Sequence, residues 1–467
     1  MVSPSTAIAR ILAGLAMTAV FAAQAFGQYG LRDTEIEETL RDFTDPILLA
    51  GGLSPKSVDI YFLADPELNA FVTRGQNIFL HSGLILQAET PNELKGVIAH
   101  EAGHIVGGHI VRSDYGTRSA YGAMLLAAGV GLAAILAGET SAGAMVLGGS
   151  SSFAATEAAA YSRINESAAD QYAATFLEQT GQSGQGLIDF FDNFRAQEHL
   201  SNARRYEYFR SHPLSADRMD KLRERVAESD YADRADPPED LFRFAMMQAK
   251  LRGFLDSPQQ VFNRFPPEDM SKPARYARSV AHFRGANVNA ALREIDTLIA
   301  DEPDNPYFHE LKAQILYESG RREEALPSAR RALELMPDAP LLKLALATSL
   351  IETDREPEMQ EALELLKTVT IDEPRNAMAW RQMARAYQGL NEPAFARYAS
   401  AEAHYSVGDI ESARSFAGRA QKDLPRSAPQ WRRASDIIAV AEIELDKKRR
   451  NRRVGKPFSI SATTPGY

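Results

Sequence analysis

The pattern of apolar and polar positions predicts a small mixed domain in the first part of the chain. Residues 33–50 form a predicted helix, and residues 58–63 form a predicted strand. The segments 69–72 and 77–81 then predict a hairpin around a turn at residues 73–76. We therefore expect helices beside a small sheet in this region.

A long helix follows the predicted sheet. Thr90-Pro91-Asn92-Glu93 signals its start, with Thr90 as the N-cap, Pro91 at the first helical position and Glu93 at the third. An edge strand beside such a helix can pair with an extended peptide backbone, whatever side chains the peptide carries. The predicted sheet therefore suits a peptide ligand.

Residues 120–160 are rich in Ala, Gly and Ser, and they have two interpretations. The stretch 120–137 is uncharged and just long enough to span a bilayer as a helix. Its apolar content is mostly Ala and Gly, which insert into membranes less favourably than Leu, Ile or Phe. We therefore expect a helical hairpin packed over the neighbouring cleft, where Gly-rich hinges suit a lid. A membrane hairpin is the alternative.

The pattern changes in the second half of the chain to paired amphipathic helices. Pro303, Pro337 and Pro374 each close a helix pair, so the spacings are 34 residues (303 to 337) and 37 residues (337 to 374). A 34-residue period is typical of tetratricopeptide repeats, whereas generic amphipathic helices have no fixed proline period. The longer unit carries an insertion around residues 353–358. Residues 236–440 are therefore predicted to form an α-solenoid whose concave face binds peptides or partner proteins.

The strongest chemical signal is the run His100-Glu101-Ala102-Gly103-His104 in the predicted long helix. Histidines four residues apart lie one above the other on a helix, so both rings can reach one metal ion. Glu101 points aside and is available as a general base for a water molecule. This is the HExxH arrangement of zinc peptidases, with one zinc ion in the chain. The alternative is a helix with two incidentally spaced histidines.

A catalytic zinc site needs a third protein ligand. Six residues past His104, where metzincins carry a histidine, this chain has Ile110. His109 is one residue short and is interpreted as a flanking or substrate-side residue, with a ligand role as the lesser alternative. Glu166, on a second predicted helix, would complete a His₂Glu set with an open fourth position. We therefore predict His100, His104 and Glu166 as the metal ligands.

Asp170 follows Glu166 by one helical turn and is predicted to accept the free N–H of a ligand histidine. Small residues around this pair would let the second helix approach the first closely: Ala168, Ala169, Ala173 and Ala174. Taken by itself, the segment is typical of a solvated acidic face. Next to an HExxH it predicts part of a metal site.

Five motifs in order resemble the HtpX/CAAX-protease-type metallopeptidases, and most of all their periplasmic branch with C-terminal tetratricopeptide repeats. They are Asn69-Ala70-Phe71, Gly75-Gln76-Asn77-Ile78-Phe79-Leu80 with Gly83-Leu84, the HExxH, Glu166-x-x-Ala169-Asp170, and Ser211-His212-Pro213 with Arg218. The resemblance extends over residues 35–440.

The resemblance implies a gluzincin with the same three ligands and the same general base. It also implies that His212 either stabilises the oxyanion or occupies the open metal position at rest, and that Arg218 supports the ligands. Without the resemblance, His212 would be a turn residue before Pro213.

Residues 1–27 have the features of a signal peptide. They contain one basic residue, Arg10, an apolar stretch too short to span a bilayer comfortably, and small residues at Ala25 and Gly27. We expect cleavage after Gly27, with an uncleaved anchor as the alternative. The chain has no cysteine, which excludes disulfides and thiol catalysis. Together these features predict a bacterial periplasmic protein.

The charge distribution excludes a nucleic-acid-binding face, because the formal net charge is −10 and no basic stripe appears. The exception is the basic run 447–453, which is followed by a Ser/Thr/Gly/Pro-rich end. We favour a solvated helix end and a disordered tail over residues 441–467. The alternative is peripheral contact with anionic lipids or an acidic partner.

The predicted fold class is therefore mostly α: a zincin-like α+β metallopeptidase domain over residues 28–235, followed by the repeat domain. We predict a zinc-dependent endopeptidase that cleaves proteins or peptides in the periplasm. The resemblance implies misassembled outer-membrane proteins as substrates and their assembly machinery as a partner of the repeats. The alternatives are a chaperone-like adaptor with a latent metal site and an intramembrane protease that uses residues 120–137.

Overall fold

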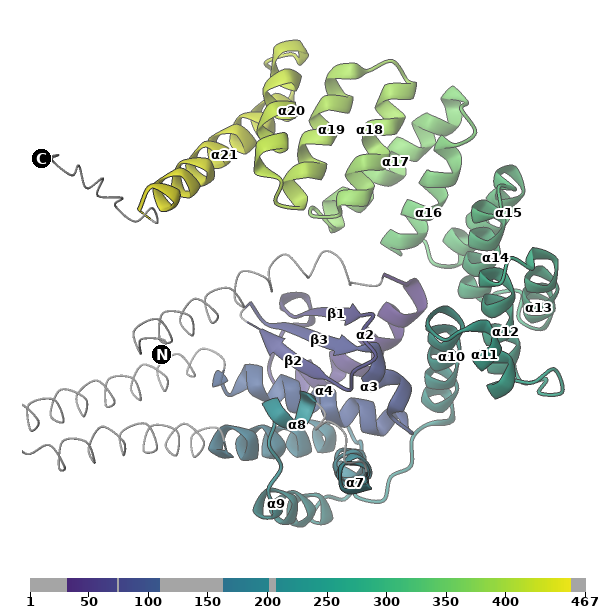
Figure 1. The fold of residues 1–467 in the computed structure, drawn as a ribbon, viewed down its shortest axis with the longest axis vertical. Helices are drawn as coiled ribbons and strands as arrows, with labels where there is room; N and C mark the ends of the chain where they lie inside the picture. The colour runs from purple at the N-terminus through teal and green to yellow at the C-terminus, as the bar shows by residue number, and fades with distance from the viewer. Residues whose placement is uncertain (1–31, 74, 110–162, 201–206, 455–467) are drawn as a thin grey trace, which may run out of the picture. The chain divides into compact units, whose positions relative to one another are not determined.

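The computed structural model describes residues 32–73, 75–109, 163–200 and 207–454. The chain divides into two compact units, with the division between Ala281 and His282 (Figure 1). The predicted signal peptide and the predicted hairpin at residues 120–160 lie outside the described residues. Within the described part of the chain, no helix has both the length and the apolar content needed to cross a membrane.

The first unit is built on a three-stranded sheet with the order β1-β3-β2. β1 (Asp59–Leu63) pairs in parallel with β3 (Asn77–His81), and β2 (Ala70–Thr73) pairs with β3 in antiparallel orientation. The predicted strands and the antiparallel pairing of the predicted hairpin are thus confirmed. β2 is an edge strand and packs next to α4 (Pro91–Val106).

Helices cover one face of the sheet (Figure 1). Ile78 and Leu80 of β3 have no exposed area and belong to one buried apolar cluster with Leu40 of α2 (Thr34–Ala50) and Val97 of α4. The other helical elements of this unit are η1 (Pro55–Ser57), α3 (Ser82–Gln87), the helix over residues 163–179, α7 (Gln185–Leu200), α8 (Glu207–Ser211), α9 (Ala216–Ala227), α10 (Pro238–Leu255), α11 (Pro258–Arg264) and α12 (Lys272–Arg284). The predicted small sheet with helices is confirmed.

α4 begins as predicted. The Thr90 side chain accepts the backbone N–H of Glu93, and Pro91 occupies the first position of the helix. The Glu93 carboxylate accepts the backbone N–H of Glu89 (2.9 Å), so it contacts the residue before the N-cap. The start of the helix that carries the HExxH is therefore fixed by side-chain caps.

α10 is anchored to the first unit by polar contacts. Gln248 donates to two backbone carbonyls at the end of α3 (2.8 and 2.9 Å). The buried Lys250 ammonium lies 2.7 Å from Asp33 and 3.4 Å from Glu35, at the start of α2. The compact division groups α10 with the sheet, whereas the predicted repeat domain begins at residue 236. The predicted domain boundaries remain predictions.

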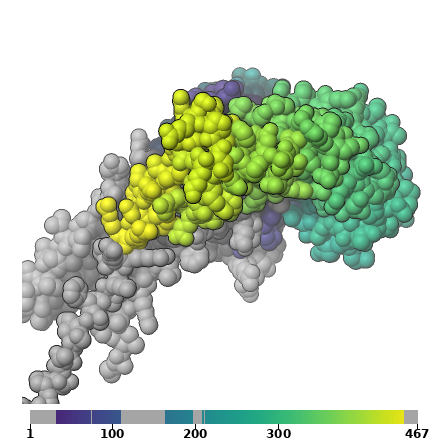
Figure 2. Space-filling model, turned by 90° about the horizontal axis from the view of Figure 1, so that it is seen from above, coloured from purple at the N-terminus to yellow at the C-terminus, as the bar shows by residue number. Residues whose placement is uncertain are grey.

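The second unit consists of consecutive helices that pack against one another and form a continuous band from green to yellow in Figure 2. They are α13 (Val288–Asp301), α14 (Pro306–Glu318), α15 (Arg322–Leu335), α16 (Pro340–Ile351), α17 (Glu356–Asp372), α18 (Ala377–Gly389), α19 (Pro393–Ser406), α20 (Ile410–Asp423) and α21 (Pro429–Val454). Pro303, Pro337 and Pro374 each follow the end of a helix, as the repeat predicts. The predicted arrangement of paired helices is confirmed.

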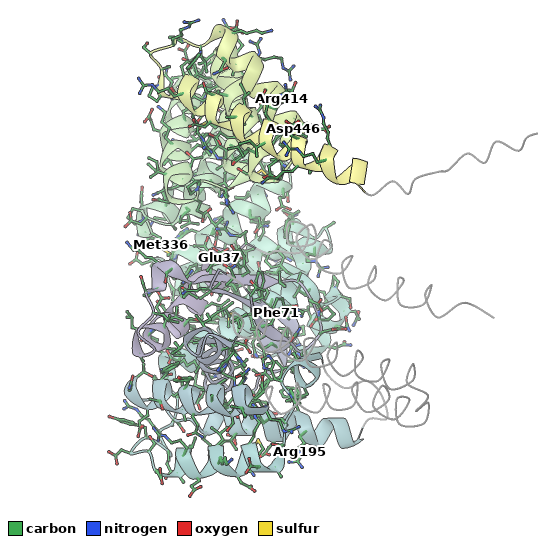
Figure 3. All side chains as sticks on the ribbon, turned by 90° about the vertical axis from the view of Figure 1, so that its left-hand side faces the viewer. Glu37, Phe71, Arg195, Met336, Arg414 and Asp446 are labelled. Carbon is green, nitrogen blue, oxygen red and sulfur yellow. The ribbon has the colours of Figure 1, made fainter. Side chains whose placement is uncertain are left out.

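The last helix extends beyond residue 440. α21 continues to Val454, and its end carries ion pairs one turn apart: Lys447 with Glu444 (2.9 Å) and Arg449 with Asp446 (3.7 Å). Such pairs stabilise a helix modestly, and the basic run is helical as far as Val454. Figure 3 labels Arg414 on α20 and Asp446 on α21, on this final pair of helices.

Candidate metal centre

α4 carries the two histidines of the HExxH motif on one buried face. His100 has no exposed area, and His104 is 6% exposed. The helix over residues 163–179 crosses close by, since a Cβ added to Gly103 would lie 2.9 Å from the Ala169 carbonyl oxygen. A glycine is therefore needed at this crossing. The close approach expected from the small residues of the second helix is present.

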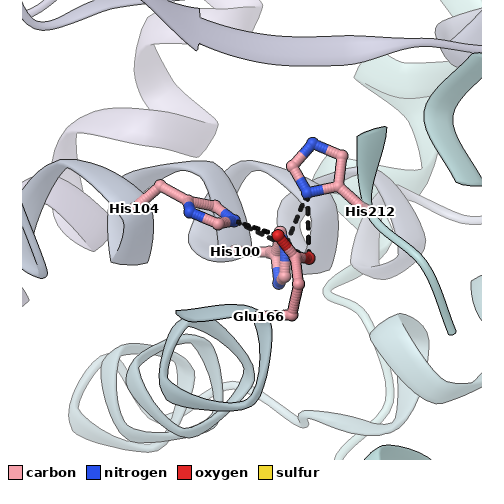
Figure 4. A group of neighbouring side chains, drawn as sticks. All are labelled: His100, His104, Glu166 and His212. Carbon is pink, nitrogen blue, oxygen red and sulfur yellow. Dashed lines mark hydrogen bonds and ion pairs between the residues drawn. The ribbon is translucent and has the colours of Figure 1, made fainter. Parts of the chain in front are cut away.

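Four side chains from three segments of the chain meet at one point (Figure 4). His100 and His104 come from α4, Glu166 from the helix over residues 163–179, and His212 from the turn after α8. All are buried, and one ligand atom of each lies within 4.8 Å of the others. The structure thus brings the predicted ligands together and adds His212 to them.

The distances between these atoms are those expected around a metal ion. His100 Nε2 lies 3.1 Å from His104 Nε2 and 3.3 Å from His212 Nδ1. Glu166 Oε2 lies 3.0 Å from His212 Nδ1, and Glu166 Oε1 lies 3.5 Å from His104 Nε2. Ligands held about 2.0–2.1 Å from a tetrahedral zinc ion are about 3.3–3.4 Å apart. The three predicted ligands therefore fit a metal ion, and with His212 the four ligand atoms lie within 4.8 Å of one another.

Asp170 and Arg218 hold the first ligand in place. Asp170 Oδ1 lies 3.0 Å from His100 Nδ1, the ring nitrogen that does not face the cluster. The Arg218 guanidinium donates two hydrogen bonds to Asp170 (2.7 and 2.8 Å) and one to the Pro213 carbonyl (2.7 Å). A carboxylate in this position fixes the orientation of a ligand histidine. Here the arginine also ties that carboxylate to the turn after α8.

Glu101 lies beside the ligand cluster. Its Oε1 is 3.5 Å from His212 Nε2, and neither of its carboxylate oxygens has a hydrogen-bond partner among the described residues. Burial raises the pKa of Glu101 and outweighs the opposing charges of His212 and His100. A buried carboxyl with a raised pKa and unpartnered oxygens is suited to accept and release a proton.

The acidic residues also determine how the histidines are charged before a metal binds. Burial lowers the pKa of His100, but its contacts with Asp170 and Glu166 outweigh this effect and raise the pKa to about 9. Burial and the neighbouring charge of His100 lower the pKa of His104. A metal ion therefore has to displace a proton from His100 at neutral pH.

His109 lies beside the cluster. Its Nδ1 is 3.0 Å from His104 Nδ1, on the ring nitrogen that does not face the other ligands. Within the described residues, the group of mutually close ligand atoms does not contain it. We therefore keep the interpretation of His109 as a flanking residue.

Tyr208 is a residue of this site that the sequence did not reveal. It precedes His212 by one helical turn on α8, and its ring stacks on that imidazole with 4.7 Å between centroids and 28° between planes. The spacing between the two residues was visible in the sequence. That spacing is informative only if residues 207–211 form a helix. α8 is only five residues long, and the pattern of apolar and polar residues in this segment does not predict a helix.

The comparison with protein families agrees with this geometry. Residues 31–226 match the model of peptidase family M48, and this range includes all four residues of the cluster. Residues 31–226 are therefore a metallopeptidase domain of family M48. The predictions of an enzyme and of a metal site are confirmed at this level.

Individual relatives extend the comparison. The Beta-barrel assembly-enhancing protease of Escherichia coli (strain K12) is 24% identical over 407 residues, which cover 85% of this chain and 80% of that protein. Metalloprotease YcaL of the same organism is 30% identical over 179 residues, which cover 37% of this chain and 63% of that protein. A solved thermophilic TPR protein of Thermus thermophilus is 18% identical, covers 36% of this chain and 100% of its own, and has a TM-score of 0.25. A likeness at that TM-score adds no weight to the fold assignment.

Proposed function

We propose that the chain is a zinc-dependent endopeptidase with His100, His104 and Glu166 as its zinc ligands. The supporting observation is the buried donor cluster, whose atoms lie 3.1 Å (His100 to His104) to 3.5 Å (His104 to Glu166) apart. A zinc ion held there would polarise the substrate carbonyl and lower the pKa of water to about 7.

The protein's own residues then have separate tasks. Glu101 takes a proton from the attacking water and later gives it to the leaving amine, which its raised pKa favours. Asp170 and Arg218 keep the His100 ring in the orientation that a metal requires. The edge strand β2 offers main-chain hydrogen bonds to an extended substrate.

Three substitutions test the assignment of base and ligands. Glu101→Gln is expected to abolish cleavage of casein and to leave about one zinc ion per chain, because the ligands are intact. Glu166→Ala is expected to lower the zinc content, since two histidines alone seldom hold zinc tightly. If zinc content survives Glu166→Ala and falls in His109→Ala, the third ligand is His109.

His212 is proposed to close the site at rest. Its Nδ1 lies 3.0 Å from Glu166 Oε2 and 3.3 Å from His100 Nε2, so the imidazole would be placed to act as a fourth ligand of a bound zinc ion. His212→Ala is then expected to raise basal proteolysis, including self-cleavage. A variant that keeps its zinc and cleaves about 10²–10³-fold more slowly would instead identify His212 as an oxyanion donor.

The wider role is proposed from the resemblance and the relatives. We place the enzyme in the periplasm, with misassembled outer-membrane proteins as substrates and the repeat helices docking partners or substrates. The name of the Escherichia coli relative, which covers 85% of this chain, supports this proposal. In a strain that lacks the gene, misassembled outer-membrane proteins should accumulate, and Glu101→Gln should fail to clear them where the wild type succeeds.

The position of His212 beside the three proposed ligands also favours a second candidate, a chaperone-like adaptor with a latent metal site. An adaptor would keep its function in Glu101→Gln, because binding through the repeats needs no general base. Full complementation by Glu101→Gln, together with no casein cleavage by His212→Ala, would favour the adaptor over the enzyme.

A further inference from the structure

The proposed mechanism does not use the hydroxyl group of Tyr208, which lies at the metal site. Its side chain has no exposed area. One face of the ring stacks on His212, and Phe190 packs against the ring edge-on, with 5.5 Å between centroids and 90° between planes. The ring is therefore held firmly beside the ligand cluster.

The hydroxyl is the unusual part of this side chain. It is buried, and it has no hydrogen-bond partner among the described residues. Buried tyrosine hydroxyls usually find a partner, because an unsatisfied polar group destabilises the folded state. Tyr276 provides the contrast, since it is equally buried and its hydroxyl donates to Glu35 (2.7 Å).

The position of the ring brings the hydroxyl to the site. A phenolic hydroxyl can donate a hydrogen bond as well as accept one. Tyr208 stacks on His212, whose Nε2 lies 3.5 Å from Glu101 Oε1, so the protein holds an unused donor next to the residues of the site.

We infer that Tyr208 donates a hydrogen bond to the carbonyl oxygen of the peptide bond under attack, after the His212 imidazole has moved off the ring. The inference rests on the peptidase function proposed above. A fixed donor aimed at an oxygen that gains negative charge binds the transition state more strongly than the substrate. The hydroxyl lacks a partner in the closed arrangement because the group that it serves enters only with the substrate.

Tyr208→Phe tests this role because it keeps the ring and removes only the hydroxyl. We expect kcat for fluorescein-labelled casein to fall about 10²–10³-fold and KM to stay within about twofold of the wild type. Zinc content should not change. The melting temperature of the metal-free protein should stay the same or rise, because the variant no longer buries an unpartnered polar atom.

Tyr276→Phe is the matched control. It removes a hydroxyl that is equally buried but paired with Glu35 in the structure, away from the metal cluster. We expect a lower melting temperature and an unchanged kcat, which is the opposite pattern to that of Tyr208→Phe.

Two results would overturn the inference. One is a Tyr208→Phe protein with wild-type kcat. The other is a Tyr208→Phe protein whose melting temperature falls as far as that of Tyr276→Phe, because the hydroxyl would then have a structural partner. The melting comparison needs no turnover, so it can reject the inference even if His212 keeps the wild type slow. Casein cleavage by Glu101→Gln would reject the peptidase mechanism itself, whatever Tyr208→Phe does.

Discussion

Ionised side chains lie inside the first unit, around the metal centre, and mostly on the surface of the second. The Asp170 and Arg218 side chains pair at 2.7 Å while only 3% and 2% exposed. On the repeat helices, Arg330 and Glu361 pair at 2.6 Å while 44% and 40% exposed. The two pairs have similar geometry, so the surroundings decide what each contributes.

The difference shows what each unit is built to do. Buried ion pairs contribute little net stability, because desolvation offsets most of their attraction. The repeat helices instead pack through small and aliphatic residues such as Ala329, Ala347 and Leu366, all buried. The buried charges of Asp170 and Arg218 are therefore explained by the metal centre that they orient, whereas the repeat helices are held mainly by packing.

The largest expected difference is in stability, when the arginine of the buried pair and the arginine of the exposed pair are each replaced. Arg218→Met leaves the buried Asp170 carboxylate with only the His100 ring beside it (3.0 Å), so we expect a loss of about 3–5 kcal/mol in the free energy of unfolding. Arg330→Met, the matched control, should cost no more than about 1 kcal/mol. Urea denaturation of both proteins measures the difference, and similar losses in the two variants would contradict the comparison.

Asp170→Asn tests whether the buried pair serves the metal. The amide keeps the size of the side chain and removes the charge that orients His100, so metal affinity should fall by about 10–100-fold. Competition with a chromogenic chelator measures it. Glu361→Gln makes the same exchange on the repeat surface and should leave affinity unchanged. Equal affinities in Asp170→Asn and the wild type would make Asp170 a purely structural residue.

Glu93 extends the comparison to pH. Burial raises the pKa of this carboxyl from 4.5 to about 7, so the folded protein holds a proton that the unfolded chain releases. Stability from this group is therefore present below pH 4.5 and is lost as the pH rises towards 7. The melting temperature of the wild type relative to Glu93→Gln should fall by about 2–4 °C between about pH 5 and pH 8. If the difference in melting temperature between the wild type and Glu93→Gln does not change with pH, the pKa of Glu93 is not raised.

The smallest effect is expected where a surface pair is removed completely. The double change Arg330→Ala with Glu361→Ala should show a coupling energy of about 0.2–1 kcal/mol in a double-mutant cycle. Because both side chains are exposed, the coupling should weaken further in about 1 M salt. A coupling above about 2 kcal/mol would show that the surface pair behaves like a buried one.

Local signals in the sequence predicted much of the fold. Thr90 and Pro91 set the start of α4 because a cap depends on neighbouring residues alone. The same holds for the prolines that close the repeat helices. The anchoring of α10 was not predicted, because the pair formed by Lys250 and Asp33 joins residues 217 positions apart. No local pattern encodes such a contact.

In the candidate site too, some residues could be predicted from local sequence patterns and others could not. His100, His104, Glu166 and Asp170 were found because helical spacing makes their relative positions predictable. The position of His212 needed a resemblance to a family, since the turn after α8 has no periodic pattern. Tyr208 was missed because its meaning comes from a stacking partner and an unpartnered hydroxyl, and both are visible only in three dimensions.

The residues of the metal centre lie far apart along the chain, and this affects when the centre can form during synthesis and folding. His100 and His212 are 112 residues apart in sequence, and Glu166 and His212 are 46 residues apart. An unfolded chain therefore does not hold these side chains together, because only the folded domain brings their ligand atoms within 4.8 Å of one another. The proposed ligands and the general base lie at or before residue 166, so His212, which we propose closes the site, is the last of these residues to be synthesised.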